Sequence, residues 1–159
     1  MNTKIDLAYG DKVYDLVVGE LTKTQKESLS EKIKKEQSKV VAYSVLKTSF
    51  TELTDAYETN KGLLENDREL PIVEKVKLLW EQKKLLVEIK KMRPDVEAKA
   101  KEPVLFEEIA REQFDLLIIG EDKASLIKEI DSCGDSYQEV LNTILTTVKK
   151  EKEKKSSNS

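Results

Sequence analysis

The sequence predicts a mainly α-helical protein, with an N-terminal β-hairpin packed on a helical bundle that contains a long antiparallel helical hairpin. It becomes an α+β protein if the β-hairpin is counted. Apolar residues alternate with polar ones near the N-terminus, which is the period of a strand. Beyond residue 20 they recur every three or four residues, which is the period of a helix. With 159 residues, the chain has the length of a single domain.

Residues 1–19 are expected to form the β-hairpin. Gly10-Asp11 suits a two-residue type II′ turn, because glycine accepts the positive φ of the first turn position. The resulting cross-strand pairs are Leu7–Tyr14, Ile5–Leu16 and Asp6–Asp15. The first two pairs build an apolar face, whereas the third sets like charges opposite each other. A lone hairpin is marginal in water, so this apolar face must pack on helices or on another chain.

Residues 20–93 should form the long helical hairpin. Thr22 to Gln25 matches a capping box, and the first helix should end near Asn60 to Gly62. Its apolar seam has 3-4-3-4 spacing and contains Tyr43, Leu46, Phe50, Leu53 and Tyr57. Pro71 can open the second helix, which should run to about Met92.

The second helix carries two apolar stripes, so its two ends are expected to bury different faces. One stripe contains Ile72, Val73, Val76, Leu79 and Trp80, and the other contains Leu78, Leu85, Ile89 and Met92. The simplest pairing brings the seam of the first helix against this helix, with Trp80 near Phe50. Both aromatic side chains are then expected in the core.

Residues 94–103, between two prolines, are expected to be a linker or a short solvated helix. Residues 104–148 should form compact helices, within which 114–119 fits either a helix or a buried strand. Asp122 is expected to cap one helix, which Gly134 stops, and Ser136 opens a capping box for the next. The Lys/Glu-rich residues 149–159 are expected to be disordered.

The side chains available argue against an enzyme. The chain has no histidine and one cysteine, so Cys/His zinc sites and His-based catalytic pairs cannot be built. We expect no catalytic residue, no metal and no cofactor. Cys133 is expected to have a packing role. Basic and acidic residues nearly balance to a net charge of −3, which disfavours nucleic acid as a partner. No apolar run suits a membrane span, so a cytoplasmic protein is expected.

The apolar faces exceed their obvious internal partners, which favours protein binding and self-association. The candidate partner-binding residues are Tyr43, Tyr57, Leu85, Ile89, Met92, Tyr137, Leu141 and Leu145.

The chain opens with the hairpin segment Ile5–Tyr14, continues with helices and the segment Phe114–Lys123, and has a Lys-rich end. In this order of elements it resembles the tail-assembly chaperones of long-tailed bacteriophages. The resemblance implies a protein that coats the hydrophobic tape-measure protein in the host cytoplasm before tail polymerisation. It also implies that a longer, frameshifted form often exists. The alternatives are a small helical regulator or inhibitor of a folded protein and a structural component of a larger assembly.

Overall fold

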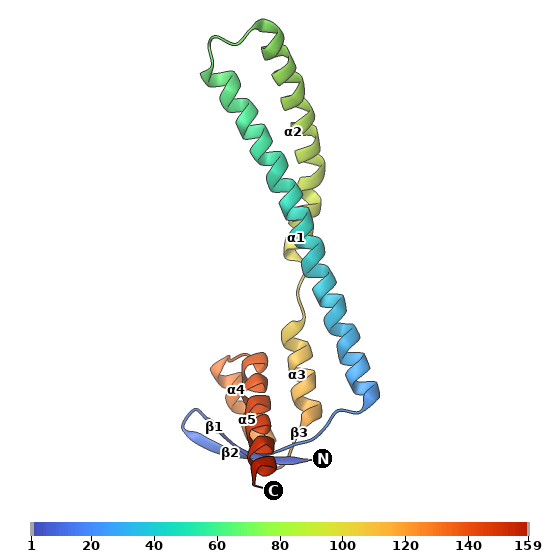
Figure 1. Ribbon diagram of the computed structural model, residues 1–159, viewed down its shortest axis with the longest axis vertical. Helices are drawn as coiled ribbons and strands as arrows, with labels where there is room; N and C mark the ends of the chain where they lie inside the picture. Colours follow the sequence, from blue (N-terminus) through green and yellow to red (C-terminus); the bar gives the residue numbers. More distant parts are fainter. Residues whose placement is uncertain (1, 159) are drawn as a thin grey trace. The chain divides into compact units, whose positions relative to one another are not determined.

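The structure is a computed structural model that describes residues 2–158. Within them lie a three-stranded antiparallel sheet and five helices (Figure 1). The strands are β1 (Thr3–Tyr9), β2 (Lys12–Val18) and β3 (Ile118–Ile119). The helices are α1 (Lys23–Asn66), α2 (Ile72–Lys101), α3 (Phe106–Leu117), α4 (Lys123–Cys133) and α5 (Tyr137–Ser157). The predicted class, mainly α with an N-terminal β-hairpin, is confirmed.

The chain divides into two compact units. Residues 1–36 and 104–159 form the sheet unit, and residues 37–103 form the helical-hairpin unit. Each unit has its own packing, and each is described by itself.

The β-hairpin has the predicted register and turn. Leu7 pairs with Tyr14 and Asp6 with Asp15, and Gly10 has a φ of 60°, as the first position of a type II′ turn requires. One face of the sheet is buried against the helices of the sheet unit, so the expectation that it packs on helices is confirmed. The side chains with the least exposure in this core are Leu16, Phe114, Ile118, Leu126, Ile130 and Ile144.

Residues 114–119 contain both of the alternatives left open by the sequence. Helix α3 continues to Leu117, and Ile118–Ile119 then pairs antiparallel with the end of β2. The chain changes from helix to strand where Gly19 donates its N–H to the carbonyl of Leu117 at 2.8 Å. The helical turn therefore ends where a neighbouring strand supplies the next hydrogen bond.

Two expected irregular segments are helical. Helix α2 runs through Pro94 to Lys101, so of the two alternatives for 94–103 the exposed helix is correct over most of that length and the linker is wrong. Proline removes its own N–H bond, and the flanking bonds continue the helix. Helix α5 runs to Ser157, which contradicts a disordered tail up to that residue. Lysine and glutamate are good helix formers, and Lys154 lies 3.7 Å from Glu151.

The helix starts were predicted with mixed success. Thr22 and Gln25 form the reciprocal bonds of a capping box, at 3.2 and 2.9 Å. Asp122 precedes α4 but does not cap it, because its Oδ2 accepts the backbone N–H of Asp15 at 2.8 Å. Gly134 ends α4 with a φ of 68°, as expected.

The start of α5 is capped by a different helix. Ser136 makes no capping bond to α5, and its hydroxyl donates to Glu107 Oε2 at 2.9 Å. The backbone N–H of Tyr137 donates to the other oxygen of the same carboxylate. Glu107 of α3 therefore satisfies the first orphan N–H of α5, and the capping box predicted at Ser136 is wrong.

Candidate protein-interaction surface

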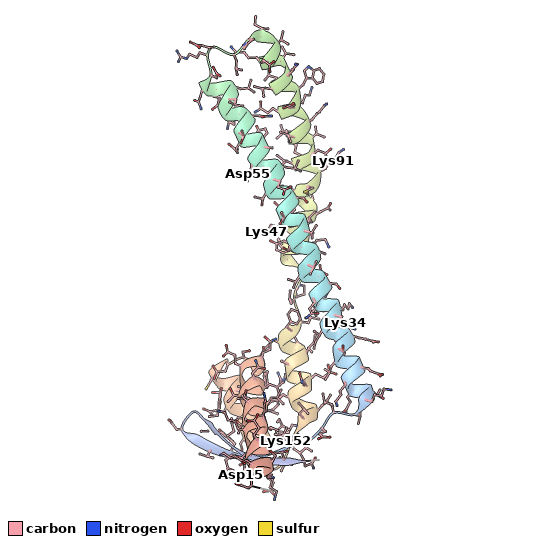
Figure 2. All side chains as sticks on the ribbon, in the orientation of Figure 1. Asp15, Lys34, Lys47, Asp55, Lys91 and Lys152 are labelled. Atoms are coloured by element: carbon pink, nitrogen blue, oxygen red, sulfur yellow. The ribbon has the colours of Figure 1, made fainter. Side chains whose placement is uncertain are left out.

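Helix α2 carries apolar side chains on two opposite faces. Within the helical-hairpin unit, α1 and α2 lie side by side and antiparallel (Figure 1), and Figure 2 shows side chains projecting from α2 both toward α1 and away from it. The inner face contains Leu78, Leu85, Ile89 and Met92. Ile89 is buried and the other three are half-buried, like the seam of α1 from Tyr43 to Tyr57.

The outer face of α2 is exposed. It contains Ile72, Val73, Val76, Leu79, Trp80 and Val87. Trp80 is 62% exposed and Val73 66% exposed, so the prediction that Trp80 packs near Phe50 in the core is wrong. At about 100° per residue, the two stripes of α2 lie on nearly opposite sides. A single neighbouring helix covers one stripe and leaves the other in water.

Lysines border the outer face of α2. They are Lys77, Lys83, Lys84, Lys90 and Lys91. Lys83 Nζ lies 5.9 Å from the centroid of the Trp80 ring, a distance at which a cation is attracted to an indole. None of these lysines forms an ion pair with a described residue. The surface thus combines apolar side chains with positive charge that has no partner within the described chain.

Of the eight predicted partner-binding residues, three are buried, four are half-buried and one is exposed. In the helical-hairpin unit, Ile89 is buried, and Tyr43, Tyr57, Leu85 and Met92 are half-buried. In the sheet unit, Tyr137 and Leu141 are buried, whereas Leu145 is 37% exposed. A binding role for these eight residues stays a prediction, and Leu145 is the one with the most open side chain.

The outer face of α2 was missed as a binding surface because its stripe was assigned to the core. The available signal was the presence of two stripes on one helix with only one helix expected beside it. The excess of apolar faces was recognised, but the sequence did not say which stripe is uncovered, and the stripe of Leu85, Ile89 and Met92 was chosen for binding in place of the outer face of α2.

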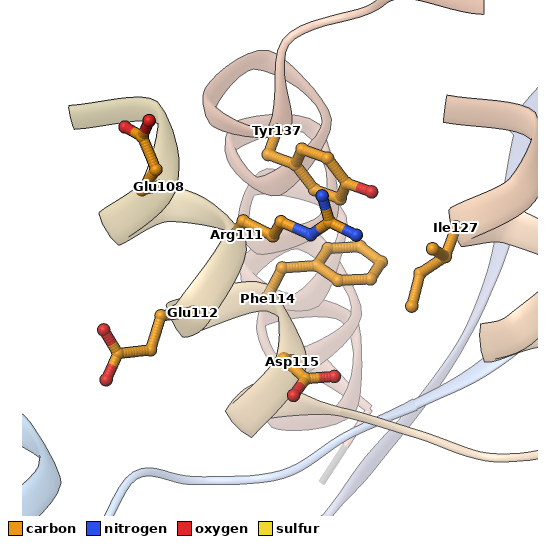
Figure 3. Close-up of a pocket in the computed structure, with 7 residues that line it drawn as sticks. All are labelled: Glu108, Arg111, Glu112, Phe114, Asp115, Ile127 and Tyr137. Carbon is orange, nitrogen blue, oxygen red and sulfur yellow. The ribbon is translucent and has the colours of Figure 1, made fainter. Parts of the chain in front are cut away.

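A second candidate site is a hollow of about 430 Å³ beside α3. In Figure 3, the side chains of Arg111, Phe114 and Tyr137 gather together and Ile127 points toward them. The Arg111 guanidinium lies 5.3 Å from the Tyr137 ring and 3.5 Å from Asp131. The Tyr137 hydroxyl donates to Asp131 at 2.7 Å.

Burial, followed by this hydrogen bond, raises the pKa of Tyr137 to about 12. The phenol of Tyr137 therefore stays protonated at neutral pH, and its O–H is already engaged in the hydrogen bond to Asp131. Arg111 and the Tyr137 hydroxyl both have Asp131 as a partner, which fits a packing role for this cluster better than a catalytic one. Within residues 2–158, no group of three acidic or cysteine side chains is placed to hold a metal ion.

Cys133 is exposed rather than packed, because it occupies the last residue of α4, where the chain turns at Gly134. Its Sγ lies 3.7 Å from Glu129 Oε1. Local desolvation and the negative charge of Glu129 raise the pKa of the thiol. A raised pKa lowers the thiolate fraction, so the geometry gives no support to a nucleophilic role.

Comparisons with protein-family models, with curated proteins and with solved structures found no match to this chain. In the described part of the chain, no helix has both the length and the apolar character needed to cross a membrane.

Proposed function

We propose that this chain is a non-catalytic protein-binding protein, an assembly chaperone that covers an apolar helix of its partner. The exposed outer face of α2 carries the proposal. Contiguous apolar surface on a folded protein is typical of a binding site, and six large apolar side chains project here along one helix. Covering them would remove their surface from water and stabilise the complex.

The partner class follows from shape and charge. A helical stripe with 3-4 spacing is complementary to the apolar stripe of another helix. The bordering lysines favour a partner helix whose apolar stripe is flanked by acidic residues, because such charges steer association and select the partner. The order of elements resembles phage tail-assembly chaperones, and this resemblance supports the tape-measure protein as the partner.

Trp80 provides a direct test, since it is the only tryptophan in the chain and is 62% exposed. A tape-measure protein encoded with this chain should be co-expressed with it and the complex purified. We expect the two proteins to co-purify and the Trp80 emission to shift to shorter wavelength, because binding transfers the indole from water to an apolar contact.

Matched valines supply the control. Val73→Glu places a charge on the outer face of α2 and should abolish co-purification, whereas Val45→Glu alters a valine of α1 with 62% exposure and should leave it intact. Circular dichroism should show that both variants remain helical. Equal loss of binding in both variants, or none in either, would refute the outer face of α2 as the docking site.

A further inference from the structure

The outer edge of β1 is open. In the sheet order β1-β2-β3, β1 is a seven-residue edge strand. Lys4, Asp6 and Ala8 are exposed along it. None of these three residues has a backbone hydrogen bond to a described residue outside the hairpin. An edge strand with unpaired N–H and C=O groups is a template for another strand.

The hairpin fixes which backbone groups point to this edge. In a two-residue hairpin, the residues that flank the turn form a hydrogen-bonded pair, and bonded pairs then alternate along the strands. Tyr9–Lys12 is that flanking pair, so the groups of Lys4, Asp6 and Ala8 point outward. The same alternation predicts that the N–H of Asp15 on β2 points away from β1. It does so, because it donates to Asp122 at 2.8 Å.

The outward groups restrict how a second β1 could pair with this one. In a symmetric antiparallel pair, Lys4, Asp6 and Ala8 must lie opposite one another's outward groups. Centring the pair on Lys4 or on Asp6 places identical charges opposite each other, which is unfavourable. Centring it on Ile5 instead places Lys4 of each copy opposite Asp6 of the other, which gives two opposite-charge pairs. Centring it on Leu7 places Asp6 opposite Ala8, which brings neither repulsion nor attraction. The register centred on Ile5 is therefore the one that charge attraction favours.

The same register accounts for the acidic pair on the exposed face of the sheet. Asp6 lies opposite Asp15, and like charges in a direct cross-strand pair are destabilising. A lysine on the other side of Asp6 would place a positive charge next to this pair. Lys4 of a second copy occupies that place in the register centred on Ile5.

We propose that two copies of this chain join edge to edge through β1 into one continuous antiparallel sheet, with Lys4 of each copy opposite Asp6 of the other. The dimer uses the sheet unit and does not depend on the outer face of α2. A strand edge supplies the backbone bonds, and the charge pattern supplies the register.

Charge exchange at these two positions tests the proposal. Lys4→Asp and Asp6→Lys should each place like charges opposite each other, whereas the double variant restores two opposite-charge pairs with their direction reversed. Sedimentation equilibrium of the full chain should give a mass approaching twice 18.2 kDa at high concentration. Each single variant should raise the dimer Kd by about tenfold or more, and the double variant should recover most of that loss.

Asp6→Lys also removes the repulsion from Asp15, so this variant should remain folded, and circular dichroism checks that its loss of dimer does not come from unfolding. Lys12→Asp reverses a charge at the first residue of β2, next to the turn and away from the open edge of β1. It should leave the Kd unchanged. Val73→Glu should also leave it unchanged. A wild-type chain that remains at 18.2 kDa, a dimer insensitive to both single variants, or a double variant that does not recover would each overturn the proposal.

Discussion

The Asp6–Asp15 pair shows how one residue position affects the stability of the sheet unit. The two exposed side chains face each other across β1 and β2. The hydrogen bond that the protonated Asp15 carboxyl donates to Asp6, followed by the negative charge of Asp6, raises the pKa of Asp15. Since the pKa of Asp15 in the folded protein exceeds its unfolded value, its protonation favours folding. That contribution is present at low pH and is lost as the pH rises through the folded pKa.

Asp15→Asn should therefore raise the melting temperature at neutral pH, because the amide keeps a hydrogen-bonding group opposite Asp6 without the second charge. At about pH 3, where carboxyls are largely protonated, the variant and wild type should melt at nearly the same temperature. Thermal unfolding followed by circular dichroism at both pH values measures the difference. An equal gain at both pH values would show that charge repulsion is not the cause.

At the scale of the element, the start of α5 depends on a carboxylate from α3. Glu107 binds Ser136 and the first backbone N–H of α5, next to the positive end of the helix dipole. The contact also ties two helices of the sheet-unit core together. The Glu107 carboxylate thus acts as a charged helix cap that comes from another helix and not from the residues next to α5.

Glu107→Ala should destabilise the protein by about 1 kcal/mol, in line with the loss of a helix cap. Glu107→Gln should cost less, because the amide oxygen can still accept the Tyr137 N–H. Ser136→Ala should also cost less than Glu107→Ala, since Ser136 makes no bond to α5. Chemical denaturation gives these differences, and a larger loss for Ser136→Ala would support local capping instead.

Helix α2 offers a comparison between its two faces. Ile89→Ala on the inner face should cost about 2 kcal/mol, as expected for a buried side chain cut back to its Cβ. Trp80→Ala on the outer face should change stability by less than about 0.5 kcal/mol, as for other exposed positions. Denaturation followed by helical circular dichroism tests both variants. A large loss for Trp80→Ala in the isolated protein would mean that the outer face is covered in solution.

The sequence predicts elements well where the determinants are local. The hairpin register follows from the Gly10-Asp11 turn and strand alternation, and the Thr22 capping box lies within four consecutive residues. Glu107 was missed because no local pattern connects it to Ser136, which lies 29 residues later. The outer face of α2 was missed for a related reason. Periodicity identifies an apolar face, but it does not say whether a neighbour covers that face.

At the scale of the whole molecule, burial is very unequal between the two units. The sheet unit contains nearly all of the buried hydrophobic residues, whereas Ile89 is the one such residue described in the helical-hairpin unit. A helix pair with so little buried apolar surface should open more easily than a packed sheet-and-helix core. This low local stability suits a segment that is completed by a binding partner.

Phe114→Ala tests this difference within the full chain. Phe114 is 0% exposed and packs edge-on against Tyr137, with ring centroids 5.5 Å apart. Its loss should cost about 3–5 kcal/mol, which corresponds to roughly a hundredfold or greater acceleration of the slowest amide exchange in α3 and α5. The amides of α2 between Ile72 and Val87 should exchange faster in the wild type and accelerate much less in the variant, because local opening already exposes them. Hydrogen exchange read by mass spectrometry measures both regions at once. Equal acceleration in both would mean that the two units unfold as one cooperative structure, and that α2 does not depend on a partner for its stability.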